Sequence, residues 1–210
     1  VAEKERGFER AFFLVGSYVA YQKTAGKLIA ENKITKDGLK CAVIEEFILG
    51  VQVNFNFFYS PISNRLELVG TDTRRQTNIE GILKLTSSFQ DQIAPIVSPK
   101  YEEAGHIAVT TLESMLEEAF NMGQKFVDAA REMFSPGVLG PFSLQSSITP
   151  GPPKKEIVVF DVSPRMPGSP GIFATPYSGY LWGKNLSMGR RVAMEIKEAI
   201  EKGKLDEVTT

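Results

Sequence analysis

The sequence predicts an α+β protein in which an antiparallel or mixed sheet is flanked by helices. Residues 51–59 alternate between large apolar and mostly polar side chains, the period of two that is typical of a strand. A polar turn at 60–64 separates them from a second strand-like segment at 65–72, so the two are expected to form an antiparallel hairpin. Apolar residues at helical spacing over 110–134 predict a long helix. A local hairpin beside helices is typical of the α+β class.

The other elements follow from shorter signals. A capping box at Thr110 and Glu113 is expected to begin the long helix. Ser17 and Ser187 are expected to cap two more helices, which end near Asn32 and Lys202. Four further strands are predicted at 11–15, 41–47, 140–148 and 156–162, with a Pro-rich turn at 149–153 and connections or loops at 33–40, 72–81, 86–101 and 163–185.

Composition excludes several classes of protein. The chain has 210 residues with 24 Lys and Arg against 25 Asp and Glu, so bulk charge argues against nucleic acid or a membrane surface as partner. The single cysteine, Cys41, cannot form an internal disulfide and is expected to be a buried thiol within an apolar run. The single His106 cannot build a histidine metal site. With no apolar span or leader sequence visible, a cytoplasmic setting is expected.

Three groups of residues could carry chemistry. Glu45 and Glu46 are adjacent at a strand end before Gly50, so one carboxylate must face a cleft or solvent. Gln145 and Asp161 lie on strands that a hairpin would bring together, and oxygen ligands of this kind hold Mg²⁺ beside nucleotide phosphates. A solvated strand end is the alternative for the first pair, and a neutral amide is a weak Mg²⁺ ligand in the second.

The third group is cationic. Arg165 follows the strand at 156–162 at the mouth of a Gly/Pro loop, where a guanidinium could bind phosphate oxygens through two hydrogen bonds. Arg74 and Arg75 near Asn78 form a second group suited to an anion. Ordinary surface charge is the alternative interpretation of each.

Taken together, these motifs resemble the carboxyl-terminal half of the ATP-grasp ligases. A closer resemblance extends from about Ile44 to Thr210. It is to the archaeal formate-dependent phosphoribosylaminoimidazolecarboxamide ligases, also called FAICAR synthetases. The segments that carry it are Phe58-Tyr59-Ser60-Pro61, Leu66-Glu67-Leu68, Gly105 to Leu116, Gly137-Val138-Leu139-Gly140-Pro141-Phe142, Pro176-Tyr177-Ser178 and Leu186-Ser187-Met188-Gly189-Arg190-Arg191.

The resemblance implies an ATP-grasp-like sheet without that family's amino-terminal α/β domain, in a carboxyl-terminal fragment. Residues 1–50 would be part of the small subdomain with its hinge, and 51–210 the carboxyl-terminal subdomain. The implied reaction converts ATP, formate and the aminoimidazole ribonucleotide AICAR into ADP, phosphate and FAICAR in purine synthesis. ATP and Mg²⁺ are the implied cofactors, AICAR and formate the small-molecule partners, and a homo-oligomer is possible.

The resemblance also assigns residues to roles. Glu45, Glu46, Phe47 and Ile48 match the hinge that binds the adenine of ATP. Gln145 and Asp161 match metal ligands, and Arg165 would be catalytic, facing the transferred phosphoryl group. Asn78 and Arg74 fall in the stretch that would contact AICAR.

The chain departs from the family pattern at several positions. Residues 1–10 match the glycine-rich phosphate loop but contain one glycine and three glutamates, and glutamate hinders close approach to phosphate. Asp161 replaces a glutamate, and Gly171 stands where an asparagine is expected. Two alternatives therefore stay open: a catalytically impaired paralogue that binds a nucleotide or a partner, and an ATP-grasp ligase for another carboxylate and amine.

Overall fold

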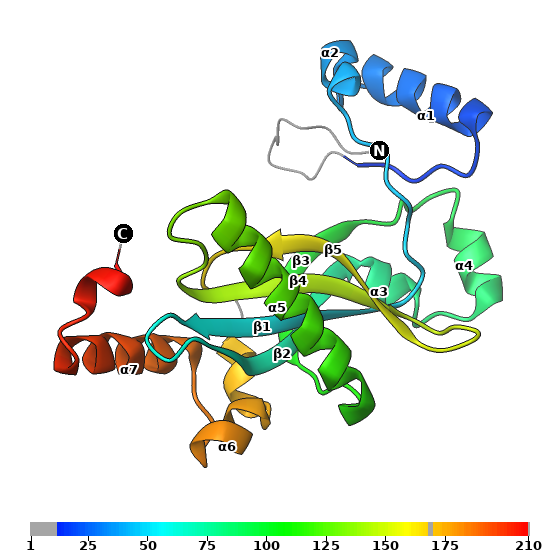
Figure 1. The fold of residues 1–210 in the computed structure, drawn as a ribbon. Helices are drawn as coiled ribbons and strands as arrows, with labels where there is room; N and C mark the ends of the chain where they lie inside the picture. The colour runs from blue at the N-terminus through cyan, green and yellow to red at the C-terminus, as the bar shows by residue number, and fades with distance from the viewer. Residues whose placement is uncertain (1–11, 168–169, 210) are drawn as a thin grey trace.

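A computed structural model describes residues 12–167 and 170–209 and confirms the α+β class (Figure 1). Its five strands form one antiparallel sheet in the order β3-β2-β1-β4-β5. The strands are β1 (Val51–Ser60), β2 (Arg65–Asn78), β3 (Tyr101–Ala108), β4 (Gly140–Thr149) and β5 (Glu156–Ser163). Strand β1, the first half of the predicted hairpin, is therefore at the centre of the sheet.

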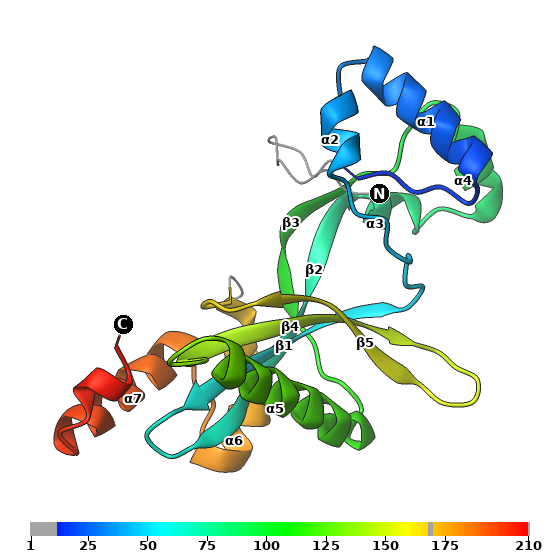
Figure 2. The ribbon, with the colours of Figure 1, turned by 45° about the horizontal axis from the view of Figure 1, so that its top comes forward.

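Helices cover part of each face of the sheet and lie beyond its end (Figures 1 and 2). Helix α5 crosses one face, α6 and α7 gather at one end, and α1 and α2 lie beyond the other. Within the described ranges, no helix is both long and apolar enough to cross a bilayer. The helices are α1 (Tyr18–Ala30), α2 (Lys36–Lys40), α3 (Ile79–Ile82), α4 (Ser87–Ile93), α5 (Leu116–Met133), α6 (Tyr177–Trp182) and α7 (Met188–Glu201), with short 3₁₀ turns η1 (Glu113–Met115), η2 (Pro170–Ala174) and η3 (Leu205–Glu207).

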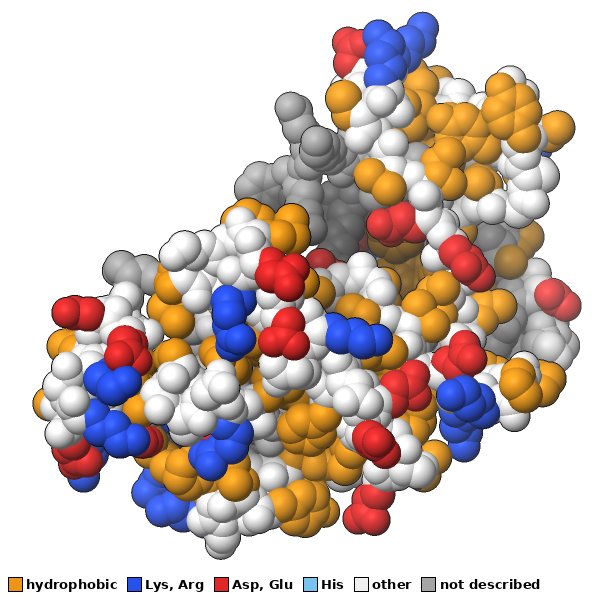
Figure 3. Space-filling model, in the orientation of Figure 1, with side chains coloured by type: hydrophobic (Ala, Val, Ile, Leu, Met, Phe, Trp, Pro, Cys, Tyr) orange, Lys and Arg blue, Asp and Glu red, His pale blue; other side chains and the backbone are white. Residues whose placement is uncertain are grey.

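Side-chain charges are mixed over the molecular face drawn in Figure 3, where acidic and basic groups alternate and apolar side chains gather on the unit that carries α1. Tyr18 and Val19 of α1 are largely exposed, at 71% and 74%. In keeping with the near-zero net charge of the sequence, acidic and basic side chains are intermixed on this face.

Two predicted helix caps are confirmed. The Ser17 hydroxyl accepts a hydrogen bond from the backbone N–H of Ala20, and the Ser187 hydroxyl accepts one from that of Arg190. Each bond satisfies a donor that the first turn of a helix leaves without a partner. The two serines therefore fix where α1 and α7 begin.

Two strand predictions are wrong. Of the predicted strand at 11–15, Ala11 lies outside the described residues, and the rest forms only an isolated bridge at Phe12. Of the predicted strand at 41–47, only a bridge at Val43 forms, Cys41 is exposed rather than buried, and Ile44 is 78% exposed. An apolar run forms a strand only where a neighbouring strand supplies hydrogen-bond partners. Among the described residues, no strand pairs with residues 44–49.

Other boundaries also differ from the prediction. Strand β2 continues through the expected polar connection to Asn78, and the expected loop at 86–101 contains α4 and ends at the first residue of β3. The connection at 33–40 contains α2, and the loop at 163–185 contains η2 and α6. The long helix begins after η1, and no side chain caps it, so the capping box at Thr110 does not form.

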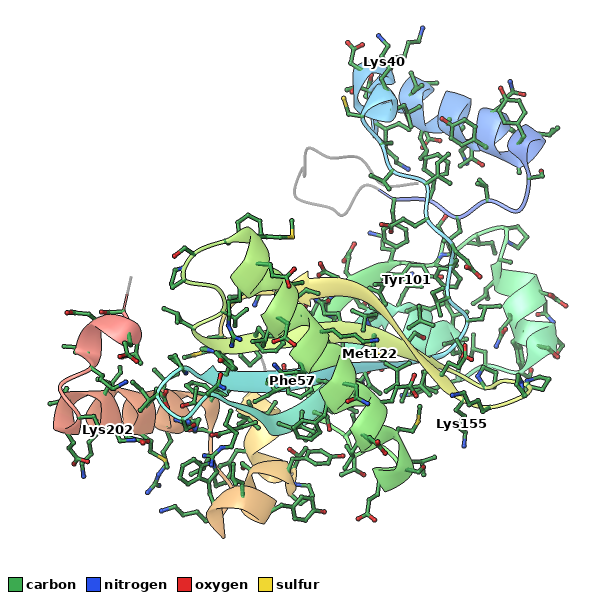
Figure 4. All side chains as sticks on the ribbon, viewed as in Figure 1. Lys40, Phe57, Tyr101, Met122, Lys155 and Lys202 are labelled. Carbon is green, nitrogen blue, oxygen red and sulfur yellow. The ribbon has the colours of Figure 1, made fainter. Side chains whose placement is uncertain are left out.

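The apolar face of the sheet packs against α5. Phe55 and Phe57 of β1 are fully buried, and the Phe57 ring lies 5.6 Å from that of Phe120 on the helix. Figure 4 shows Phe57 and Met122 in this layer. A Cβ on Gly123 of α5 would lie 3.2 Å from the Phe57 ring, so glycine lets the helix approach the sheet closely. The predicted buried face of residues 55, 57 and 59 is confirmed.

The opposite face of β1 carries Asn54 and Asn56, which are also buried. Asn54 pairs with Asp72 and Asn56 with Gly70, whereas Phe57 pairs with Leu68, so a β-bulge lies between these pairs. A Cβ on Gly70 would come within 2.7 Å of Ile172 in η2, so only glycine fits at this position. The bulge brings Asp72 onto the same face as the two asparagines.

A buried ionic network anchors α7 to the same sheet. The Arg191 guanidinium donates to Glu67 of β2 at 2.7 and 3.0 Å and to Glu195 at 2.8 Å, and all three side chains are almost fully buried. The guanidinium carbon also lies 4.1 Å from the centre of the Phe58 ring. Breaking such a network leaves a buried charge without full compensation.

We predict that Glu67→Gln lowers the free energy of unfolding by about 3 kcal/mol, because it removes one partner of a buried ion pair. Urea unfolding followed by circular dichroism measures the effect. Glu198→Gln is the matched control, since Glu198 forms a solvent-exposed pair with Lys202 and its loss should cost less than about 1 kcal/mol. Equal effects of the two substitutions would contradict the role given to Glu67.

The same network predicts a dependence of stability on pH. Burial raises the pKa of Glu67, but hydrogen bonds and charge from Arg191, with donors from Arg65 and Trp182, outweigh this and hold the pKa below its ordinary value of 4.5. This stabilisation is therefore complete above about pH 4.5 and is lost as the pH falls through the lowered pKa of the folded state. Unfolding measured between pH 7 and 3 should show the wild type converging on Glu67→Gln in acid.

Candidate functional site

A polar hollow of about 140 Å³ lies on the sheet face that carries Asn54 and Asn56. Residues that pair across antiparallel strands point to the same side, and here this rule collects polar side chains from all five strands and the loop after β5. The lining residues are Asn54, Asn56, Asp72, Arg74, Glu103, His106, Ser143, Gln145, Ser163, Arg165 and Pro167.

Gln145 on β4 connects the two sides of this hollow. Its Nε2 donates to the Asp161 carboxylate at 2.6 Å and to the Ser163 hydroxyl at 2.7 Å, while its Oε1 accepts from Arg74 at 2.5 Å. The predicted approach of Gln145 and Asp161 is confirmed, although the amide nitrogen, not the oxygen, faces the carboxylate. Arg74 starts on β2 and reaches β4 across the central strand between them.

Asp72 is the second centre of hydrogen bonds. Its carboxylate, 1% exposed, accepts from Asn56 Nδ2 at 2.6 Å, from Asn54 Nδ2 at 3.1 Å and contacts Nδ1 of His106. The other ring nitrogen of His106 lies 2.8 Å from Glu103. Because carboxylates only accept, both His106 contacts are hydrogen bonds only when the ring carries both protons.

The site places basic side chains beside acidic and neutral polar ones. The buried Arg74 side chain lies between Gln145 and Glu103, whose carboxylate is 3.4 Å from Arg74 Nε. Arg165 is exposed, and its Nη1 donates to the carbonyl of Met166 at the rim. The hollow therefore offers guanidinium groups to an anion and carbonyl or carboxylate oxygens to a donor or cation.

Of the groups that could meet a Mg²⁺ ion arriving with phosphates, Asp161 supplies a carboxylate and Ser163 a hydroxyl, whereas Gln145 turns its Nε2 toward both of them and its Oε1 toward Arg74. No group of three or more His, Cys, Asp or Glu suited to a metal occurs in the described parts of the chain. Mg²⁺ commonly binds through one or two carboxylates and substrate phosphates rather than an all-protein cage.

The predicted adenine hinge lies elsewhere. Residues 45–48 belong to an extended segment, mostly exposed, between α2 and β1, and none of them is among the described residues that line the polar hollow. A larger hollow of about 1070 Å³ lies between α1 with the preceding residues 12–14 and the segment 98–103 before and within β3. Neither of these hollows is lined by Glu46, so among the described residues Glu46 does not share the polar hollow with Gln145.

Asn78 is also separated from Arg74. Its Nδ2 donates to the carbonyl of Ser98 at 3.1 Å, and its Oδ1 accepts from the N–H of Lys100 at 2.7 Å. Asn78 thus joins the end of β2 to the segment leading into β3. Arg74, four residues earlier, lines the polar hollow.

Sequence reasoning missed Asn54, Asn56, Asp72 and His106. The asparagines occupy the polar positions of the alternating strand, a signal that was visible but does not distinguish a site from a solvated face. Asp72 joins them only through the bulge, because the register at the hairpin turn would place Thr71 opposite Asn54. His106 lies on a strand that was not predicted.

We predict that Asp72→Ala destabilises the fold by about 2–4 kcal/mol, because two buried amide donors lose their acceptor. Thermal and urea unfolding measure the loss. Asp91→Ala, in the exposed part of α4, is the control and should change stability by less than about 0.5 kcal/mol. A similar stability for both variants would show that the buried carboxylate does not organise this face.

The sequence of this chain matches a family of known proteins. Residues 20–210 match the family described as Domain of unknown function (DUF1297). Curated relatives named 5-formaminoimidazole-4-carboxamide-1-(beta)-D-ribofuranosyl 5'-monophosphate synthetase are 36% identical, over 203 residues in Methanosphaera stadtmanae and 201 residues in Methanocaldococcus jannaschii. These matches cover 96% and 95% of this chain and 54% of each relative. The chain thus spans about half the length of these relatives.

A solved structure agrees with the sequence relatives. The crystal structure of an IMP biosynthesis protein PurP from Thermococcus kodakaraensis superposes with a TM-score of 0.62 at 34% identity, covering 79% of this chain and 51% of that one. The resemblance to FAICAR synthetases seen in the sequence is confirmed by these relatives; the predicted phosphate loop at 1–10 lies outside the described residues. With a match that begins at residue 20 and runs to the end of the sequence, the chain belongs to the DUF1297 family.

Proposed function

We propose that this chain is part of an ATP-grasp ligase that formylates AICAR, and that it binds the phosphates of the nucleotide and the amine of AICAR. The observation that carries the proposal is the polar sheet face, where Gln145, Asp161 and Ser163 lie together beside Arg165. Its support is the 36% identity to proteins named for the formylated product. The proposed reaction converts ATP, formate and AICAR into ADP, phosphate and FAICAR.

In this reaction ATP would transfer its terminal phosphoryl group to formate, and the AICAR amine would then displace phosphate from the acyl carbon. The task of the protein is mainly to position the reactants and to neutralise charge on the phosphoryl oxygens. We assign the second task to Arg165, whose guanidinium lies at the rim of the hollow, where an incoming anion can pair with it.

Asp161 and Gln145, with Ser163, would hold Mg²⁺ by their oxygens. The ion would offset the charge of the nucleotide phosphates. For Gln145 to bind through Oε1, that oxygen must give up its hydrogen bond from Arg74. Asp161 needs no comparable exchange, since the hydrogen bond from Gln145 occupies only one of its two carboxylate oxygens. We therefore expect Asp161 to be the principal ligand.

We place adenine near Glu45, Glu46, Phe47 and Ile48, and we place AICAR against Arg74. The extended, exposed backbone of 45–48 has N–H and C=O groups available for a purine edge. Asn78, by contrast, uses both ends of its amide to hold residues 98–100, so we assign it to shaping the strand end rather than to direct substrate contact.

The proposal predicts that Asp161→Ala and Arg165→Ala each reduce ligase turnover by about 10²–10³-fold, the effect typical of removing one charge-stabilising group. The assay follows ADP release that requires both formate and AICAR. Both residues are exposed, so the variants should unfold like the wild type.

Arg190→Ala is the matched control, an exposed arginine on α7 away from the hollow, and should keep wild-type turnover. If the wild-type protein binds Mg-ATP but neither variant changes formate-dependent ADP release, Asp161 and Arg165 are not in the reacting site. Absence of Mg-ATP binding at millimolar concentration would overturn the ligase proposal as a whole.

A further inference from the structure

The floor of the polar hollow contains two asparagines whose amide orientation is fixed by chemistry. Asp72 is buried and accepts from Nδ2 of both Asn54 and Asn56. A carboxylate has no hydrogen to donate, so neither amide can turn its oxygen toward Asp72. Both Nδ2 groups are therefore committed to the carboxylate, and both Oδ1 atoms must point elsewhere.

These two oxygens lack partners. Asn54 and Asn56 are 4% and 1% exposed, and the Oδ1 of each is buried with no hydrogen-bond partner in the parts of the chain that the structure describes. Both residues line the hollow. A buried carbonyl oxygen without a donor destabilises the fold, and a ligand that supplies N–H groups would remove that cost.

The surroundings select the class of ligand. An anion is disfavoured at the floor, because the unpartnered atoms are acceptors and Asp72 lies behind them. A Mg²⁺ ion is disfavoured because two neutral amide oxygens are a poor set for it, and both oxygens of Asp72 already accept hydrogen bonds. An NH₂ group has two hydrogens for two acceptors.

We propose that Asn54 and Asn56 bind the exocyclic amine of an aminoimidazole substrate through their Oδ1 atoms and so act as positioning residues. This assignment rests on the proposed function, which brings such an amine to this hollow. With both N–H bonds directed at the floor, the nitrogen lone pair would face away from it. Arg74, which is held by Gln145 and Glu103 and spans the central strand above this floor, would face the ribonucleotide's anionic or carbonyl groups.

The test compares two ligands that differ only at this group. Calorimetry of the full chain measures the affinity of AICAR and of the same ribonucleotide with hydrogen in place of the 5-amino group. We expect the wild type to favour the amine by about tenfold, the worth of one to two hydrogen bonds. We expect Asn54→Ser and Asn56→Ser to reduce this preference toward one, since each replaces the amide by a shorter hydroxyl and so removes the Oδ1 acceptor.

Asn121→Ser, on the exposed side of α5 across the sheet, is the matched control and should keep the wild-type preference. An equal loss of affinity for both ligands in the floor variants would overturn the assignment, because the asparagines would then only maintain the shape of the hollow. Equal wild-type affinity for the two ligands would also overturn it, even if neither variant folds.

The outcomes separate this inference from the function on which it rests. Binding of both ribonucleotides without preference removes the role of Asn54 and Asn56 but leaves the ligase proposal intact. Failure of both ribonucleotides to bind, in protein that binds Mg-ATP, overturns the proposed substrate and this assignment together.

Discussion

The Asp72 carboxylate is the constraint on which the site depends. A charge that is 1% exposed persists only when donors surround it, and Asn54, Asn56 and His106 supply them from the neighbouring strands β1 and β3. Meeting this requirement fixes the rotation of two amides and the position of an imidazole. The two amides and the imidazole that face Asp72 are therefore oriented before any ligand enters the hollow.

The sheet separates two tasks by its faces. One face gives aromatic side chains to α5, with Phe57 stacked 5.5 Å from Phe142 and packed against Phe120. The other face is polar at the site and becomes apolar again where Phe58 meets Ile172 and Met188. Rigid packing beneath the strands thus supports a polar surface whose groups need accurate placement.

Much of the fold was predictable, because alternation over 51–59 and the apolar stripe over 110–134, within which α5 forms, are strong periodic signals. The segment 41–47 misled for a physical reason: apolar composition does not supply a neighbouring strand. The site was predictable only in part. Gln145 and Asp161 follow from a simple hairpin, whereas Asp72 reaches the floor through a bulge at Val69 and Gly70 that packing against η2 stabilises, and no local pattern reveals it.

Burial on both sides of β1 has a consequence for how the protein can evolve. From Val53 to Ser60 every residue of this strand is buried, and from Val53 to Phe57 side chains of the core and of the hollow alternate one by one. A strand with one side in solvent tolerates substitution at every second residue. Here both sides of the strand are buried, so neither alternating set of residues can change freely. Change in what the hollow can bind is accordingly more accessible at the edges, on β3 and in the loop after β5, than along the strand that contributes the floor.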